Sequence, residues 1–200
     1  MDLFLMQHGA AVSDDVDPAR PLSEGGREEV VRVLARAGAA GVRVERCVHS
    51  GKLRAEQTAV LLGQSLGADV EARTGLNPKD PVAPVLEWLA SQARAAKHQP
   101  EWEAPARDAP ELHPPYQVAA DPTADPAAPA ASLAIVGHLP FLDRLASVLV
   151  AGEETAQVLR FRNGALVKLV PKDEAPGQGG HVGGASPGWR IDWVLPSVLA

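Results

Sequence analysis

The stretch LFLMQHG at residues 3–9 and the stretch LAIVGH at residues 133–138 decide the fold. Each is a short apolar run that leads to a histidine beside a glycine, His8 in the first and His138 in the second. A short, continuous apolar run is typical of a strand buried on both faces. Ligands of parallel α/β sheets bind at the carboxyl ends of the strands, so both histidines are candidates for one site. The alternative is that each is a strand-end histidine without function.

Around these two strands the apolar residues recur at helical spacing. Ser23 is a candidate N-cap for a helix that begins near Gly26 and stops at Gly38. Further helices are expected over 52–66, 82–96 and 140–150, and further strands over 44–48 and 189–195. Residues 159–169 are expected to form a hairpin around an Asn-Gly turn. The alternation of strands with helices predicts an α/β fold.

Two stretches have the composition of surface loops, and neither resembles a domain boundary. Residues 98–131 hold eight prolines and ten alanines, which predicts a flexible insertion. Residues 172–188 hold six glycines, which predicts a glycine-rich loop at the flexible tip of a hairpin. Because the alternation of strands and helices resumes beyond the insertion, we expect one domain over residues 1–200.

Composition and charge favour a cytoplasmic protein that binds neither nucleic acid nor membranes. The net charge of −6 lacks the basic excess that nucleic acid and anionic membranes attract. There is no apolar run long enough for a transmembrane helix, and the first residues lack the pattern of a signal peptide. The single cysteine, Cys47, excludes an internal disulfide and suits a reducing compartment. An acidic chain can still hold a local basic site for an anion.

A candidate anion site begins where the second helix starts. Arg54 lies one turn into that helix, close to Ser50 and Lys52. A helix N-terminus offers free backbone N–H groups, and an arginine there adds a bidentate clamp for an oxyanion. The alternative is an arginine at the helix surface that pairs with a nearby acid such as Glu56.

Four motifs stand in the order of one family: QHG at 7–9, RPLSEGGR at 20–27, SGKLRAEQTA at 50–59 and IVGHLPFL at 135–142. Together they resemble the motifs of the histidine phosphatase superfamily, which is phosphoglycerate mutase-like, and within it the SixA-like phosphohistidine phosphatases. The resemblance covers residues 1–90 and 132–170. It implies a three-layer α/β/α domain with a mostly parallel central sheet.

The resemblance also implies a role for each matching residue. His8 would be the nucleophile and would carry the phosphoryl group transiently, while Arg54 and His138 would hold its oxygens. Gln7 and Leu139 would complete the phosphate-binding set. The implied enzyme needs no metal and no other cofactor. Its implied substrate is a phosphohistidine protein, such as a histidine phosphotransfer domain in a signalling relay.

The chain departs from the family pattern at two places. Gln7 stands where the family has arginine, so a charged hydrogen bond to phosphate is lost. In the loop where many members carry a glutamate, Asp80 is the one acid that could serve as proton donor, unless it is an ordinary turn residue. A phosphohistidine substrate needs a proton donor less, because its P–N bond is more labile than a phosphoester bond.

Three alternatives remain open at this stage. The first is a general phosphatase for small phosphomonoesters, and the second is a catalytically weak module that binds phosphate or phosphoproteins, which Gln7 suggests. The third is a metal site built from His8, His49, His138 and Asp80, although their spacing matches no known ligand motif.

Overall fold

A computed structural model describes residues 1–97, 131–172 and 188–197 of the 200-residue chain. Nearly all of the predicted insertion (98–131) and of the predicted glycine-rich loop (172–188) lies outside these described residues. Within the described ranges the elements are β1 (Asp2–Gln7), α1 (Glu24–Ala39), β2 (Arg46–His49), α2 (Leu53–Leu66), β3 (Asp69–Ala72), α3 (Ala83–Lys97), β4 (Ser132–Gly137), α4 (Phe141–Ala151), β5 (Leu166–Pro171) and β6 (Trp189–Leu195).

The described strands form one sheet in the order β3-β2-β4-β1-β5-β6. The four strands from β3 to β1 are parallel, whereas β5 and β6 are antiparallel to their neighbours. The prediction of a mostly parallel sheet is therefore confirmed. Parallel neighbours end at the same edge, so residues that follow β1, β2 and β4 are brought together there.

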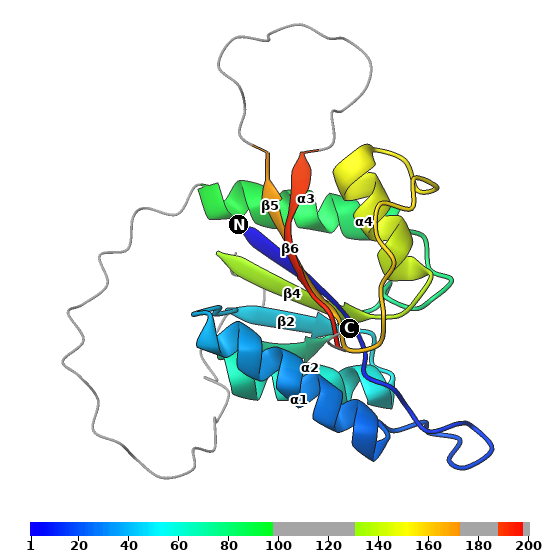
Figure 1. Ribbon diagram of the computed structural model, residues 1–200. Coiled ribbons are helices and arrows are strands. Elements are labelled where there is room, and N and C mark those ends of the chain that lie inside the picture. The colour runs from blue at the N-terminus through cyan, green and yellow to red at the C-terminus, as the bar shows by residue number, and fades with distance from the viewer. Residues whose placement is uncertain (98–130, 173–187, 198–200) are drawn as a thin grey trace, which may run out of the picture.

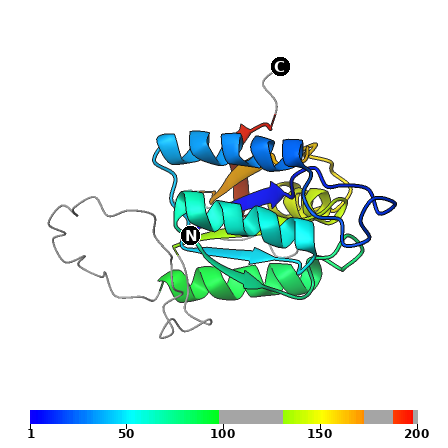
Figure 2. The same ribbon diagram turned by 90° about the horizontal axis from the view of Figure 1, so that it is seen from below.

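Helices cover both faces of the sheet, as a three-layer α/β/α domain requires (Figure 1). On one face Leu3 and Leu5 of β1 belong to a core cluster with residues of α3 and α4. On the other face Phe4 and Met6 belong to a second cluster with residues of α1 and α2. Figure 2 shows α1 and α3 on opposite sides of the strands. Burial on both faces explains why the apolar run of β1 is continuous rather than alternating.

The predicted N-cap of α1 is confirmed, whereas its predicted stop is wrong. Ser23 accepts a hydrogen bond from Gly26 N at 3.1 Å, and Gly67 ends α2 in the left-handed conformation. Gly38, however, does not stop α1, which continues to Ala39. The left-handed residue is Gly41, whose φ is +80° and whose N–H donates to the carbonyl of Gly38.

The predicted hairpin around the Asn-Gly turn is wrong, because residues 157–165 form no strand and β5 begins only at Leu166. Gly164 instead donates its backbone N–H toward the carbonyls of Gln7 and His8, at 3.0 and 3.2 Å. The turn therefore ties the start of β5 to the end of β1. β5 pairs with β1 on one side and with β6 on the other, and β6 follows β5 in sequence beyond residues 173–187.

One strand was missed, and it is the most exposed of the parallel strands. β3 pairs with β2 at the edge of the sheet, and three of its four residues are exposed. Asp69-Val70-Glu71-Ala72 has no apolar run and too few residues for an alternating pattern, so the sequence carried no strand signal there. In the part of the chain that is described, no helix is long and apolar enough to cross a membrane.

Candidate active site

The carboxyl ends of three neighbouring parallel strands bring the candidate residues together. In the register of the sheet, Gln7 of β1 is opposite Gly137 of β4, and His49 of β2 is opposite Val136. The next residue along each strand is therefore at the same edge. These three residues are His8, Ser50 and His138.

The ring of His8 is held with one nitrogen free of hydrogen. Nδ1 lies 2.7 Å from the carbonyl oxygen of Gly9, and a carbonyl only accepts, so Nδ1 carries the hydrogen. Nε2 accepts a hydrogen bond from Arg54 Nε at 3.2 Å. Burial lowers the pKa of His8, opposed by the Gly9 bond and assisted by the positive charges of Arg54 and Arg20. At neutral pH, His8 therefore presents an unprotonated Nε2 beside a guanidinium.

His138 is the more deeply buried of the two histidines. Its ring centroid lies 4.8 Å from that of His8, and its Nε2 lies 2.6 Å from Ser50 Oγ. Its Nδ1 has no hydrogen-bond partner among the described residues. Burial lowers the pKa of His138 to about 3, with smaller contributions from the charges of His8, Arg54 and Lys52. The ring is thus neutral over the physiological pH range.

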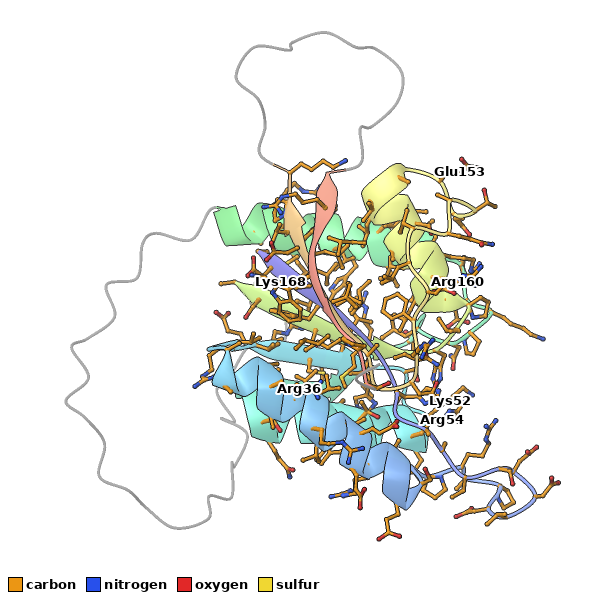
Figure 3. The ribbon with its side chains drawn as sticks, in the orientation of Figure 1. Arg36, Lys52, Arg54, Glu153, Arg160 and Lys168 are labelled. Carbon is orange, nitrogen blue, oxygen red and sulfur yellow. The ribbon has the colours of Figure 1, made fainter. Side chains whose placement is uncertain are left out.

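Arg54 is positioned by the first turn of α2, where Thr58 links the helix to the end of β1. Thr58 Oγ1 donates to the carbonyl of Arg54 at 2.7 Å and accepts from Gly9 N at 3.1 Å. Figure 3 shows Lys52 and Arg54 together at this end of the molecule. Sequence reasoning had not assigned Thr58 a role, although it lies within the LRAEQTA motif.

The side chain of Gln7 is buried and is held by Asn163. Gln7 Nε2 donates to Asn163 Oδ1, while Gln7 Oε1 has no partner among the described residues. Asn163 was missed as a site residue because its Asn-Gly sequence was interpreted as a hairpin turn. The two residues are 156 positions apart in the sequence, so no local pattern predicts the contact between Gln7 and Asn163.

Two other predicted site residues, Leu139 and Asp80, have contacts outside the cluster formed by His8, Arg54 and His138. Leu139 follows His138 directly, and its half-buried side chain packs against the core between the sheet, α3 and α4. Asp80 lies in the turn before α3, where its carboxylate accepts from Asn77 N at 2.8 Å. Among the described residues, no contact joins Asp80 to the two site histidines. The role of Asp80 as proton donor stays a prediction.

The metal site considered from the sequence is not formed. All four of its candidate residues are described, and no group of three or more His, Cys, Asp or Glu in the described ranges is arranged to hold a metal ion. His49 Nδ1 instead accepts a hydrogen bond from Gly51 N at 3.2 Å.

The arrangement of the site suits an anion. A guanidinium, a hydroxyl and two neutral imidazoles converge, with Lys52 and Arg20 near enough to lower the pKa of the histidines. A tetrahedral oxyanion can accept from several such donors at once. His8 Nε2 adds a lone pair, so the same site also offers a candidate nucleophile.

Comparison with known proteins gives fold relatives but no family match from sequence. No protein-family model matches the chain. A curated protein from Picosynechococcus sp. is 28% identical over 174 residues, 84% of each chain, and is itself uncharacterised. That sequence relative therefore carries no information about activity.

Solved structures are similar over nearly the whole chain. A protein histidine phosphatase SixA complexed with tungstate is 22% identical, with a TM-score of 0.67, over 98% of this chain and 97% of that chain. A protein of Agrobacterium tumefaciens that carries the SixA name is 16% identical, with a TM-score of 0.59, over 97% and 96%. A mycobacterial glucosyl-3-phosphoglycerate phosphatase is 19% identical, with a TM-score of 0.55, over 96% of both chains. The chain therefore has the phosphoglycerate mutase-like fold of these solved structures, and its sequence motifs resemble those of the histidine phosphatase superfamily.

Proposed function

We propose that the chain is a metal-independent phosphatase that dephosphorylates protein phosphohistidine through a covalent intermediate on His8. The observation that carries this proposal is the state of His8. Its Nε2 holds no hydrogen and faces Arg54, while the neutral ring of His138 lies 4.8 Å away. A nucleophile, a cation and further donors thus surround one position that a phosphoryl group can occupy.

The proposed reaction has two displacement steps. His8 Nε2 attacks phosphorus in line, the P–N bond of the substrate breaks, and the released imidazole takes up a proton from solvent. Arg54 and the hydrogen-bonded pair of Ser50 Oγ and His138 Nε2 donate to the phosphoryl oxygens, where the charge of a loose transition state is concentrated. Water then attacks the phosphorus on His8, loses a proton, and releases inorganic phosphate with the free imidazole.

Two observations favour a phosphohistidine substrate over a phosphoester. The carboxylate of Asp80 is engaged with the backbone of its own turn, and no other acid is described beside His8. An alkoxide leaving group needs a general acid, whereas an imidazole leaving group needs little help. A histidine phosphotransfer domain in the cytoplasm is the partner class that the SixA-like motifs suggest.

Dephosphorylation of a phosphohistidine protein by wild type, His8→Ala and Arg43→Ala tests the proposal. Arg43 is the control because it is exposed and comes before the amino end of β2, whereas the site lies at the carboxyl ends of the strands. We expect turnover and a trapped phosphoenzyme from wild type and from Arg43→Ala, and neither from His8→Ala. Turnover by His8→Ala at the wild-type rate would contradict the proposed nucleophile.

The second candidate is a module that binds phosphate or phosphoproteins without turnover. The buried Gln7 favours it, because an uncharged amide occupies a place beside the nucleophile. Phosphate binding without turnover and without labelled enzyme would establish this alternative.

The third candidate, a general phosphomonoesterase, requires an acid for the leaving group. Asp80→Asn distinguishes the two substrate classes. If Asp80 serves as the acid, the variant loses activity on a phosphoester while its activity on phosphohistidine changes little. Equal and high wild-type rates on both substrate classes would favour the general phosphomonoesterase.

A further inference from the structure

A cavity of about 590 Å³ lies between α4 and the segment that leads from α4 to β5. One wall consists of Leu139, Pro140 and α4, and the other consists of residues of the segment 154–161. This volume is within the range of pockets that hold small ligands or side chains. None of the roles assigned to the site uses this cavity.

Both walls of the cavity continue directly into the candidate active site. Leu139 in the first wall is the residue after His138. Phe161 in the second wall precedes Asn163 by two residues, and Asn163 holds the side chain of Gln7. Each wall thus lies only one or two residues along the chain from a residue of the candidate site. A group attached to the phosphate can therefore extend into the cavity.

The cavity wall contains polar atoms that lack partners. Ser147 is 1% exposed, and its Oγ makes no hydrogen bond among the described residues, although a helical serine can bond the carbonyl four residues earlier. Asp143 interacts with the backbone N–H of Phe161, but its Oδ1 has no described partner. A buried polar atom without a partner is costly, so a polar ligand group that reaches Ser147 or Asp143 gains a hydrogen bond there.

Arg160 is the one cation of the cavity wall that has no acidic partner in the described part of the chain, since the carboxylate of Asp143 interacts with the backbone of Phe161. The other arginine, Arg144, pairs with Glu154 at 3.5 Å and donates to the carbonyl of Asp80 at 2.6 Å. Arg160 is exposed and makes no such contact with any described residue. Figure 3 shows Arg160 on the same side of the molecule as Lys52 and Arg54.

We propose that this cavity binds an acidic peptide segment next to the phosphohistidine of the substrate protein, with its carboxylate on Arg160. A peptide carries a partner for each of these groups, because its N–H donates to Asp143 or Ser147 and its acidic side chain accepts from Arg160. Leu139, Leu159 and Phe161 provide the apolar surface for the rest of the segment. This assignment rests on the proposed function and names the substrate class of the same site.

Phosphohistidine peptides test the proposal. In one set a single Asp is placed at each position flanking the phosphohistidine in turn, and in the matched set Asn takes the same places. We expect one Asp position to raise kcat/KM about tenfold over its Asn counterpart, since a charged hydrogen bond contributes more than a neutral one. Equal kcat/KM for the Asp and Asn peptides at every position would overturn the proposal.

Two variants locate the effect in the cavity. Arg160→Ala removes the cation, and Thr155→Trp fills the cavity from an exposed position in its wall. Both should abolish the preference for Asp over Asn, mainly by raising KM, whereas Arg43→Ala should keep it. Retention of the full preference in both cavity variants would overturn the proposal.

Phosphoimidazole separates this proposal from the proposed function. It has the reacting P–N bond but no peptide, so only the site around His8 can act on it. Wild type, Arg160→Ala and Thr155→Trp should hydrolyse it at the same rate. No hydrolysis by wild type would refute the phosphatase, whereas equal hydrolysis without any peptide preference would refute only the role of the cavity.

Discussion

The imidazoles of His8 and His138 lie beside each other at the strand ends, and burial lowers the pKa of both. Desolvation disfavours the charged form of each ring, and the neighbouring cations disfavour it further. The same environment that keeps both rings neutral at neutral pH therefore makes the fold sensitive to acid. The charges and hydrogen bonds of neighbouring residues thus determine the protonation states of His8 and His138.

The pH dependence of stability follows from His138. Its pKa is about 3 in the folded state and near 6.5 in the unfolded chain, so on acidification the unfolded state binds the proton first. We expect the free energy of unfolding to fall as pH drops below about 6.5, by up to about 1.4 kcal/mol per pH unit for this group. His138→Gln should show a shallower fall between pH 6.5 and 4 in urea unfolding. Parallel curves for wild type and variant would contradict the assignment.

The charge at position 7 should control phosphate affinity. Gln7→Arg adds a charged donor next to His8 and can still donate to Asn163 Oδ1. We expect inorganic phosphate to bind this variant about tenfold more tightly than wild type, as measured by isothermal titration calorimetry. Gln7→Met, which removes the donor at similar volume, is the matched control and should bind phosphate more weakly. Identical affinities for the three proteins would show that position 7 does not contact the anion.

Among the elements, α1 has an N-terminus packed against the segment that follows His8. Ser23 N donates to the carbonyl of Ala10 at 2.9 Å, and Ser23 Oγ bonds the same carbonyl at 3.2 Å. Gly26 in the first turn lies so close to Ala10 that a Cβ there would overlap the Ala10 backbone. The helix thus supports the position of the loop that carries Gly9, whose carbonyl orients His8.

Two adjacent glycines of α1 provide a matched pair of variants. Gly26→Ala forces Ala10 to move, so we expect a loss of at least about 2 kcal/mol in the free energy of unfolding and reduced activity. Gly25→Ala meets nothing within 4 Å and should stabilise the helix by about 0.5–1 kcal/mol. Urea unfolding and phosphohistidine turnover of both variants check this. The expectation fails if the two substitutions have the same effect.

For the molecule as a whole, net charge and local charge have opposite signs. The chain carries a net charge of −6, yet the site is surrounded by the cations Arg20, Lys52 and Arg54. The fold achieves this by ending three strands and starting α2 at one edge of the sheet. Because the site is made by elements from distant parts of the sequence, an anion bound there should stabilise the folded state globally.

Phosphate should therefore raise the melting temperature through Arg54. At a phosphate concentration 100 times Kd, binding contributes about 2.7 kcal/mol, or roughly 5–10 °C for a chain of this size. Differential scanning calorimetry should show this increase for wild type and for Arg43→Ala, and little increase for Arg54→Ala. A full increase in the Arg54→Ala protein would place the anion elsewhere.

The sequence by itself determined the apolar cores of β1, β2, β4 and β6, the helix starts and the two site histidines. These features are local: a run such as residues 3–6 is buried on both faces, and Ser23 caps a helix three residues away. Strand ends of a parallel sheet share an edge whatever the side chains are, so His8 and His138 could be expected at one site. Local hydrogen bonding and hydrophobic periodicity were sufficient for these predictions.

Only the tertiary structure decided which residues complete the site. Asn163 reaches Gln7 across 156 residues, and its Asn-Gly turn connects β5 to β1 instead of forming a hairpin. The cavity beside Leu139 likewise requires α4 and the segment 154–161 to be packed together. Such contacts depend on the order and register of the strands, which periodicity does not encode, because many pairings bury the same apolar residues equally well.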